Sequence, residues 1–489
     1  MSGGVLIGLI LGTPLIGAVL ISLCGRWPNV RETVTLTTAI SLFVLVSQMI
    51  GPIAAGETLR LSLAEPIPGL EIAFQLEPLG MVFAMLASGL WIVTSVYAIG
   101  YMRSNNEPYQ TSFFAFFAIA ICGAMGVAMA GNLLTLFIFY EVLTLSTWPL
   151  VTHNRNEAAK QGGRVYLGIL LATSIGLLLP AIIWTYSITG TLDFTPGGIL
   201  ELDSISPLAA TLLLTMFVLG VGKAAVMPMH RWLPAAMVAP TPVSALLHAV
   251  AVVKAGVFTI TKVVIYIFGL DFLATLPLEK FLVYLAGFTV IAASLVALRQ
   301  VEIKRMLAYS TVSQLSYIVL AALVLAPFAE IGAAIHIVAH AFGKITLFFC
   351  AGAIYIAAKK TRVDQLHGIA WRMPFTMVAF TIGAVSMIGV PPTAGFVSKW
   401  YIVAGAFQVD NFFVLAVLAI STGLNAAYFL PIVFRAFFQA ETVPPAKDHG
   451  EAPWPMAAAL TLTAALTILF FFFNGPVVDF EKGILEVAS

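Results

Sequence analysis

Residues 217–258 read FVLGVGKAAVMPMHRWLPAAMVAPTPVSALLHAVAVVKAGVF. The stretch is apolar enough to lie inside a membrane, and yet it contains Lys223 and Lys254 and is interrupted by glycines and prolines. A charged side chain at the centre of a spanning helix costs ~2.5–3.5 kcal/mol on insertion scales. Interrupted helices are tolerated at that depth only where they face protein or internal water. The stretch therefore predicts membrane helices around a polar interior, with a helix break beside Lys223.

The composition of the whole chain agrees with a membrane protein. Of 489 residues, 60% are hydrophobic and 10% are charged, whereas soluble domains carry about 25% charged residues. The net charge is +1 with no basic block, which excludes a nucleic-acid-binding protein. Cys24, Cys122 and Cys350 lie apart in apolar runs, which excludes a disulfide scaffold and a cysteine-held zinc or iron–sulfur centre.

Apolar runs of about 20 residues predict fourteen spanning helices in an all-α polytopic fold. We place them at residues 5–25, 32–52, 78–101, 110–130, 132–151, 164–189, 207–229, 241–268, 280–298, 306–326, 330–358, 374–395, 411–434 and 454–474.

The basic residues test this number of helices. If the N-terminus faces outside, the loops predicted inside hold 16 basic residues and those predicted outside hold three. The inner set is Arg26, Arg31, Arg103, Arg155, Lys160, Arg164, Arg231, Arg299, Lys304, Arg305, Lys359, Lys360, Arg362, Arg372, Arg435 and Lys447, and the outer set is Arg60, Lys280 and Lys482. Such an excess is typical of cytoplasmic loops. The pattern predicts that both termini lie outside.

Five charged residues are expected deep within or at the edge of predicted spans: Glu141, Lys223, Lys254, Lys344 and Lys399. Facing lipid unpaired, they would together cost on the order of 12–17 kcal/mol, so we expect them in a paired or hydrated interior. Lys262 lies near the outer end of its span, where a lysine snorkels to the surface. The acids of ILELDSISP (199–207) and EKGILEVAS (481–489) are expected to be solvated.

Glu141 and Lys223 are the first candidate proton carriers. Glu141 is the one acid expected deep in a span, and the protonation of a buried carboxylate responds to a neighbouring lysine. Lys223 lies between Gly220 and Pro228, beside the predicted break. The alternatives are a fixed ion pair that orients two helices and a lysine that binds carbonyl groups freed at the break.

A polar stripe marks the predicted eleventh helix. His336, His340 and Lys344 are four residues apart, so they lie on nearly one face. Histidine titrates near neutrality and passes protons through either ring nitrogen, which favours a proton relay over a metal site or core packing. His248, six residues before Lys254, is expected in the same hydrated row.

Lys399 repeats the pattern of Lys223. Pro391, Pro392 and Gly395 interrupt the apolar run just before it. Two lysines beside interrupted helices in different parts of the chain indicate an internally repeated transporter.

Five motifs carry a resemblance to a known family: FYEVLTLSTWPLV (139–151), KAAVMPMHRWLPAAMVAPTPVSALLHAVAVVKAG (223–256), KRMLAYSTVSQLSY (304–317), HAFGKITLFFCAG (340–352) and GVPPTAGFVSKW (389–400). Across about residues 70–440 the chain resembles the antiporter-like subunits of respiratory complex I and of Mrp-type sodium/proton antiporters. The resemblance implies two inverted five-helix repeats, each with a broken helix. The implied organisation is one membrane domain with N-terminal helices in 1–105, repeats in 106–270 and 271–440, and a final helix in 441–489.

The resemblance also implies residue roles along a mid-membrane proton path. Glu141 matches the family's fifth-helix glutamate, Lys223 the seventh-helix lysine and Lys254 the eighth-helix lysine. His336, His340 and Lys344 match the link between two half-channels, and Lys399 matches the twelfth-helix position near the outlet.

The type of subunit is expected from two features. Position 399 is a glutamate in one type of complex I subunit, whereas lysine resembles the Mrp D subunit and the largest antiporter-like subunit of complex I. The chain ends about fifteen residues after the last predicted span, without the long C-terminal extension of that complex I subunit or of Mrp A. We expect an Mrp D-type subunit. The alternative is a proton-pumping antiporter-like subunit of a redox-driven complex I or membrane-bound hydrogenase-type complex.

The resulting hypothesis is an electrostatic relay in a secondary transporter subunit, not an enzyme. A closed Glu141–Lys223 pair holds the proton on the lysine, and opening sends it through Lys254 towards Lys399. Unit charges 4 Å apart interact by ~4 kcal/mol at an effective dielectric constant of 20. We expect no cofactor, other membrane subunits as partners, H⁺ and Na⁺ as transported ions, and a bacterial inner membrane as the location.

Two other classes of function stay open on the sequence. A quinone or haem redox enzyme would use His248, His336 and His340, although the sequence shows no nucleotide-binding loop or haem-attachment motif. A passive scaffold of a larger complex would leave the buried charges without a transport role.

Overall fold

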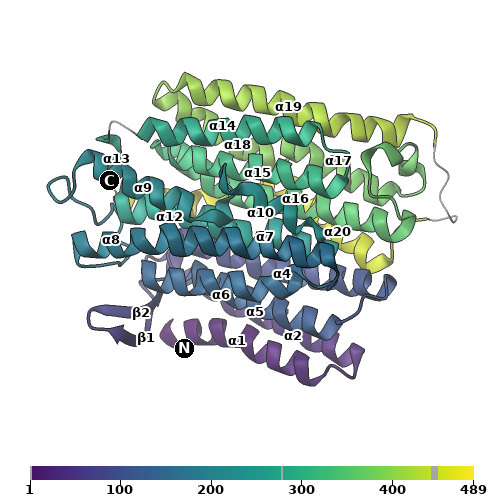
Figure 1. Ribbon diagram of the computed structural model, residues 1–489, viewed down its shortest axis with the longest axis horizontal. Helices are drawn as coiled ribbons and strands as arrows, with labels where there is room; N and C mark the ends of the chain where they lie inside the picture. Colours follow the sequence, from purple (N-terminus) through teal and green to yellow (C-terminus); the bar gives the residue numbers. More distant parts are fainter. Residues whose placement is uncertain (1–2, 277–278, 442–449, 489) are drawn as a thin grey trace.

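Long helices run side by side through the whole molecule (Figure 1). The computed structural model describes residues 3–276, 279–441 and 450–488. Within them, eleven helices are long and apolar enough to cross a membrane, and α9 (Pro207–Gly220) and α17 (Pro374–Ile388) are apolar but shorter. Each of the fourteen predicted spans overlaps one or more helices. The all-α membrane fold is confirmed, whereas the number of crossings and the side of the termini stay predictions.

The first part of the chain contains α1 (Gly3–Leu23), α2 (Pro28–Ser47), α3 (Ile50–Ala54), β1 (Arg60–Ile67), β2 (Leu70–Gln75), α4 (Pro78–Ser104), α5 (Gln110–Ala128), α6 (Leu133–Val151), α7 (Glu157–Thr173), η1 (Ser174–Leu178), α8 (Leu179–Thr189), α9, η2 (Gly222–Ala224), η3 (Met229–Arg231), α10 (Trp232–Ala235), η4 (Ala236–Val238), α11 (Thr241–Ala245), η5 (Leu246–Val250), α12 (Val252–Val263), η6 (Val264–Phe268) and α13 (Leu270–Ala274).

The second part contains α14 (Glu279–Leu298), α15 (Ile303–Ala322), α16 (Pro327–Ala358), η7 (Val363–Gln365), η8 (Ile369–Trp371), α17, α18 (Ala394–Gln408), α19 (Phe412–Phe438), α20 (Trp454–Phe472) and α21 (Gly475–Ala488).

Both predicted helix breaks are present. α9 ends at Gly220, and the short 3₁₀ turn η2 carries Lys223 before the backbone reverses at Ala225 with φ +56°. α17 ends before Gly389, whose φ of +91° favours glycine, and α18 begins at Ala394. The apolar run after the twelfth predicted span therefore forms the second half of a broken helix.

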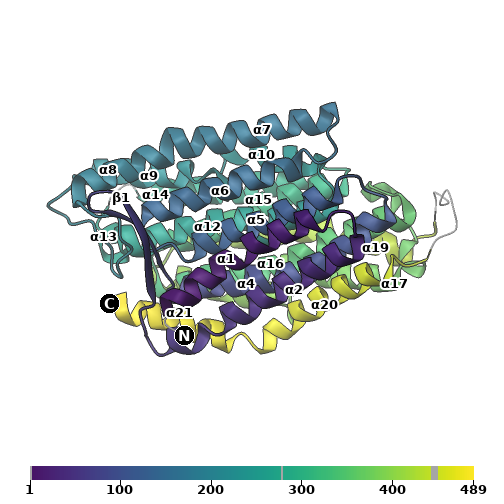
Figure 2. The same cartoon turned by 90° about the horizontal axis from the view of Figure 1, so that it is seen from below.

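Two features of the fold were not predicted. Residues 60–75 form an antiparallel hairpin of β1 and β2, and the short helix α21 follows α20. The hairpin and both termini lie at one end of the bundle, at the left in Figures 1 and 2. One basic residue of the predicted inner set, Lys447, falls outside the described residues.

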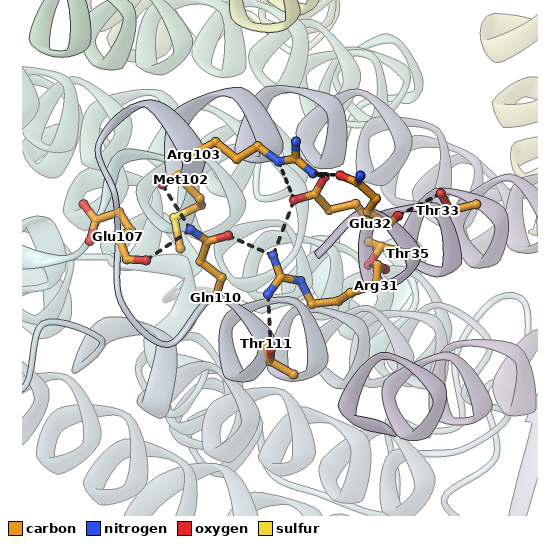
Figure 3. A network of polar contacts seen from close by, with 10 residues as sticks. Arg31, Glu32, Thr33, Thr35, Met102, Arg103, Glu107, Gln110 and Thr111 are labelled. Carbon is orange, nitrogen blue, oxygen red and sulfur yellow. Dashed lines mark hydrogen bonds and ion pairs between the residues drawn. The ribbon is translucent and has the colours of Figure 1, made fainter. Parts of the chain in front are cut away.

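An arginine–carboxylate network ties the N-terminal helices together at the opposite end of α4 (Figure 3). Arg103 forms an ion pair with Glu32, and Arg31 donates to Gln110 Oε1 (2.8 Å) and Thr111 Oγ1 (3.2 Å). Arg31 and Glu32 are both buried. The network joins α2, α4 and α5, so these charges fix helix positions at the predicted inner end.

Glycine allows α12 to pass directly against the first break. A Cβ added at Gly256 would overlap the backbone of Lys223 and Ala224, whereas one at Gly168 would meet nothing within 4 Å. Overpacking costs about 1–3 kcal/mol. We expect Gly256→Ala to lower the apparent unfolding temperature of the purified complex, and Gly168→Ala to leave it unchanged or raise it. Equal unfolding temperatures for the two variants would contradict this packing.

Candidate functional site

Lys223 is fully buried in the first break. Its Nζ donates to the carbonyl oxygen of Tyr140 (2.8 Å) and to Thr144 Oγ1 (2.6 Å). Its backbone N–H donates to the hydroxyl of Tyr140 (3.1 Å). All these partners lie on α6, which also carries Glu141. Because an amine and an ammonium both donate hydrogen bonds, these neutral acceptors serve Lys223 in either protonation state.

Glu141 does not form the expected contact with Lys223. Both carboxylate oxygens are buried, and neither has a hydrogen-bond partner among the described residues. No ion pair within 4.0 Å joins Glu141 to a described residue. The alternative of a permanent ion pair is therefore wrong for this conformation. A buried carboxylate without a donor is unfavourable unless it binds a proton or water.

A direct contact between Lys254 and His340 joins α12 to α16. Lys254 Nζ lies 2.7 Å from His340 Nδ1, and both side chains are fully buried. His340 Nε2 has no hydrogen-bond partner among the described residues, and the same is true of both ring nitrogens of His248. His248 packs against Phe348, with ring centroids 4.5 Å apart.

The polar stripe of α16 faces three different helices. His340 reaches α12, His336 Nδ1 lies 2.8 Å from Ser398 Oγ on α18, and Lys344 Nζ donates to Ser310 Oγ on α15 (2.6 Å). The rings of His336 and His340 have centroids 6.1 Å apart. α16 thus stands at the centre of the polar groups.

Lys399 lies at the second break. Its Nζ donates to the carbonyl oxygens of Met387 (3.1 Å) and Ile388 (2.8 Å) at the end of α17. The sequence alternative proposed for Lys223, a lysine that satisfies carbonyl groups freed at a break, describes Lys399 as well. Ser398, the residue before it in sequence, contacts His336.

The structure gathers six of the predicted residues around α16, namely Lys254, His248, His336, His340, Lys344 and Lys399. It holds Lys223 beside α6, within electrostatic range of Glu141. Direct contacts join Lys254 to His340 and His336 to Ser398, while the described residues show no hydrogen bond from Lys223 to Lys254. Tyr140 and Ser398 were missed by the sequence analysis, although each is adjacent in sequence to a predicted residue. No described group of three or more His, Cys, Asp or Glu residues is arranged to hold a metal ion.

Two predictions about charges near the outer end are wrong. Lys262 does not snorkel, because it is 0% exposed, forms an ion pair with Glu77 and donates to the carbonyl oxygen of Ala130 (2.7 Å). Glu481, expected in solvent, is 4% exposed because α21 packs against α4 and α16. Glu330, in the first turn of α16, is a second buried acid that the sequence analysis did not single out.

Comparisons with known proteins identify the family of the chain. Residues 130–425 match the family described as NADH:quinone oxidoreductase/Mrp antiporter, TM. "NADH-quinone oxidoreductase subunit N" of Desulforudis audaxviator is 32% identical over 85% of this chain and 83% of its own length. "Hydrogenase-4 component B" of Escherichia coli is 30% identical over 85% of this chain, which spans 64% of that relative.

Two solved structures have the same fold. A chain of the Mrp complex from Dietzia sp. is 20% identical, with a TM-score of 0.84 over 100% of this chain and 99% of its own. A chain of the membrane-bound sulfane sulfur reductase, an archaeal respiratory membrane complex, is 23% identical, with a TM-score of 0.86 over 99% and 98%. The chain therefore belongs to the antiporter-like membrane subunits of the NADH:quinone oxidoreductase/Mrp antiporter family.

Proposed function

We propose that the chain is the proton-translocating subunit of a multisubunit Na⁺/H⁺ antiporter in a bacterial inner membrane. Protons move along the buried row formed by Glu141, Lys223, Lys254, His248, His340, His336, Lys344 and Lys399. The chain is a secondary transporter subunit, and no cofactor takes part in the transfer.

The observation that carries the proposal is the buried contact between Lys254 and His340. It joins two titratable groups from α12 and α16 at 2.7 Å, and it involves no carboxylate that would lock the lysine in its charged form. A buried lysine without a counter-ion is unfavourable as a structural device. Its placement here is explained by a group that gains and loses a proton.

The proposed domain organisation follows the two breaks. Residues 106–270 contain the break at Lys223, and residues 271–440 contain the break at Lys399, with N-terminal helices in 1–105 and a final helix in 441–489. Lys399 favours a D-type subunit of an Mrp antiporter. Its partners are the other membrane subunits, and Na⁺ is the counter-transported ion.

A redox-driven complex is the second candidate. Relatives named as subunits of NADH-quinone oxidoreductase and hydrogenase-4 support it. In that setting the same row would carry protons, but the driving reaction would take place in other subunits.

The driving force distinguishes the two candidates. In everted membrane vesicles with respiration blocked, we expect added Na⁺ to release protons from the vesicle interior when the whole complex is present. Vesicles from cells that lack only this subunit should give no response. Proton movement that is independent of Na⁺ and requires an added electron donor would favour the redox-driven complex.

A further inference from the structure

A second group of buried charges lies at the predicted outer end, away from the proposed row. It consists of Glu77 before α4, Lys262 on α12, Glu330 on α16 and Glu481 on α21. Four elements that are distant in sequence therefore bring charged side chains to the same end of the bundle. We call these four residues the outer charge cluster.

Lys262 is the cation of the outer charge cluster. It forms an ion pair with Glu77, donates to the carbonyl oxygen of Ala130 (2.7 Å) and lies 4.2 Å from the centroid of the Phe194 ring. It is 0% exposed. Lys262 is therefore buried and paired, whereas its position in the sequence indicated a side chain that reaches the surface.

Two carboxylates of the cluster lack partners. Both oxygens of Glu330 and Oε1 of Glu481 are buried without a hydrogen-bond donor among the described residues. Glu330 and Glu481 lie within electrostatic range of each other, as do Glu481 and Glu77. Burial raises the pKa of Glu481 to about 8, and the charge of Glu77 adds to the effect.

The charge of the cluster must be compensated. Three ionised carboxylates and one ammonium would leave two uncompensated negative charges, and burying each such ion costs several kcal/mol. A metal ion does not fit, because no described group of three or more potential ligands is arranged to hold one. Protons are the remaining compensation, and an unpartnered carboxyl oxygen is where a proton binds.

The cluster opens towards water through a cavity. A cavity of about 660 Å³ is lined by Glu77 and Tyr266 on its inner wall and by exposed residues including Glu57 and Asp479. On the other side, Lys262 follows Lys254 by eight residues on α12, which is ~12 Å along a helix. The cluster thus lies between the proposed row and an outer cavity.

We propose that Glu77, Lys262, Glu330 and Glu481 form a proton-holding group behind the outer cavity, which Glu77 lines. Protons pass through this group between Lys254 and the outer solution. This inference rests on the proposed function. Glu330 and Glu481 each hold one proton, which together compensate the two negative charges, and the Glu77–Lys262 pair connects them to α12 and to the cavity.

The test uses the assembled complex in everted vesicles. We expect Glu330→Gln and Glu481→Gln each to slow Na⁺-driven proton release about tenfold, less than the ~100-fold of a sole proton-transfer group, because the other carboxylate remains. Glu201→Gln, at an exposed position outside this cavity, should leave the rate unchanged. Unchanged rates in both Glu330→Gln and Glu481→Gln would overturn the proposal.

An infrared readout separates the proposal from a structural role. The infrared difference spectrum between the unaltered purified complex and the Glu330→Gln, Glu481→Gln double variant should show a protonated-carboxyl band. The corresponding difference spectrum for Glu201→Gln should not. The absence of a protonated-carboxyl band from the difference spectrum of the double variant would overturn the proposal. Variants that change only the Na⁺ concentration needed for half-maximal transport, and not the maximal rate, would overturn it as well. If Glu141→Gln blocks transport and the cluster variants do not, this inference fails alone. If Glu141→Gln also has no effect, the proposed function itself fails.

Discussion

Replacing Lys223 by methionine is expected to slow proton transport on the order of 100-fold or more, since a positioned proton-transfer group contributes at least that factor. Methionine keeps most of the side-chain length and removes the titratable nitrogen. The two acceptors that Lys223 would leave, the carbonyl oxygen of Tyr140 and Thr144 Oγ1, remain hydrogen-bonded to each other, because Thr144 donates to that carbonyl oxygen (3.1 Å). The measurement is Na⁺-driven proton release in everted vesicles that contain the assembled complex.

The matched control for this variant is Lys160→Met. Lys160 is exposed and pairs with Glu157 one turn away (2.6 Å), and exposed pairs of this kind contribute ~0–1 kcal/mol. We expect normal transport. The scaffold alternative predicts that Lys223→Met, too, transports normally whenever the complex assembles, so that result would refute the relay.

The lysines of the proposed row could be predicted from the sequence because they lie within apolar spans. A lysine within twenty apolar residues is so unfavourable in lipid that its presence alone predicts a polar interior. The same argument works for Lys223, Lys254 and Lys344, all of which are fully buried in the fold. The two breaks were equally visible, since glycine and proline act locally on the backbone.

The outer charge cluster was not predicted, because its acidic residues lie at ordinary positions in the sequence. Glu77 lies just before an apolar run and Glu481 just after one, where acidic residues are ordinary. Glu481 is buried because α21 packs against α4 and α16, and Glu77 is enclosed with its partner Lys262. Packing between segments so distant in sequence leaves no periodic signal. The partner of Lys262, 185 positions away at Glu77, was unpredictable from either segment alone.

The state of Glu141 also required the structure. The sequence hypothesis was a closed pair of Glu141 with Lys223, whereas the structure places the lysine on neutral acceptors and leaves the carboxylate without a donor among the described residues. A relay of this kind needs two arrangements of the same groups. The observed contacts correspond to the open arrangement of the proposed pair.

The contact between Lys254 and His340 provides the second large effect. We expect Lys254→Met and His340→Leu each to reduce proton transport on the order of 100-fold, because each removes one end of the only hydrogen bond in the described row that joins α12 to α16. His340→Leu replaces the imidazole ring by an apolar side chain of similar width, which suits the fully buried position. The control is Thr259→Val, which alters another buried polar group of α12. Thr259 Oγ1 donates within its own helix, to the carbonyl oxygen of Ala255 (2.7 Å).

The double variant decides whether the two residues act as one unit. Groups that carry the same proton in series are non-additive, so the second substitution should cost little once the first has interrupted the path. Independent structural roles predict instead that the two reductions multiply, about 10⁴-fold in all. A double variant as active as either single one therefore supports transfer between the halves through this contact. If the two reductions multiply, or if either single variant is fully active, protons pass between α12 and α16 at another place in the bundle.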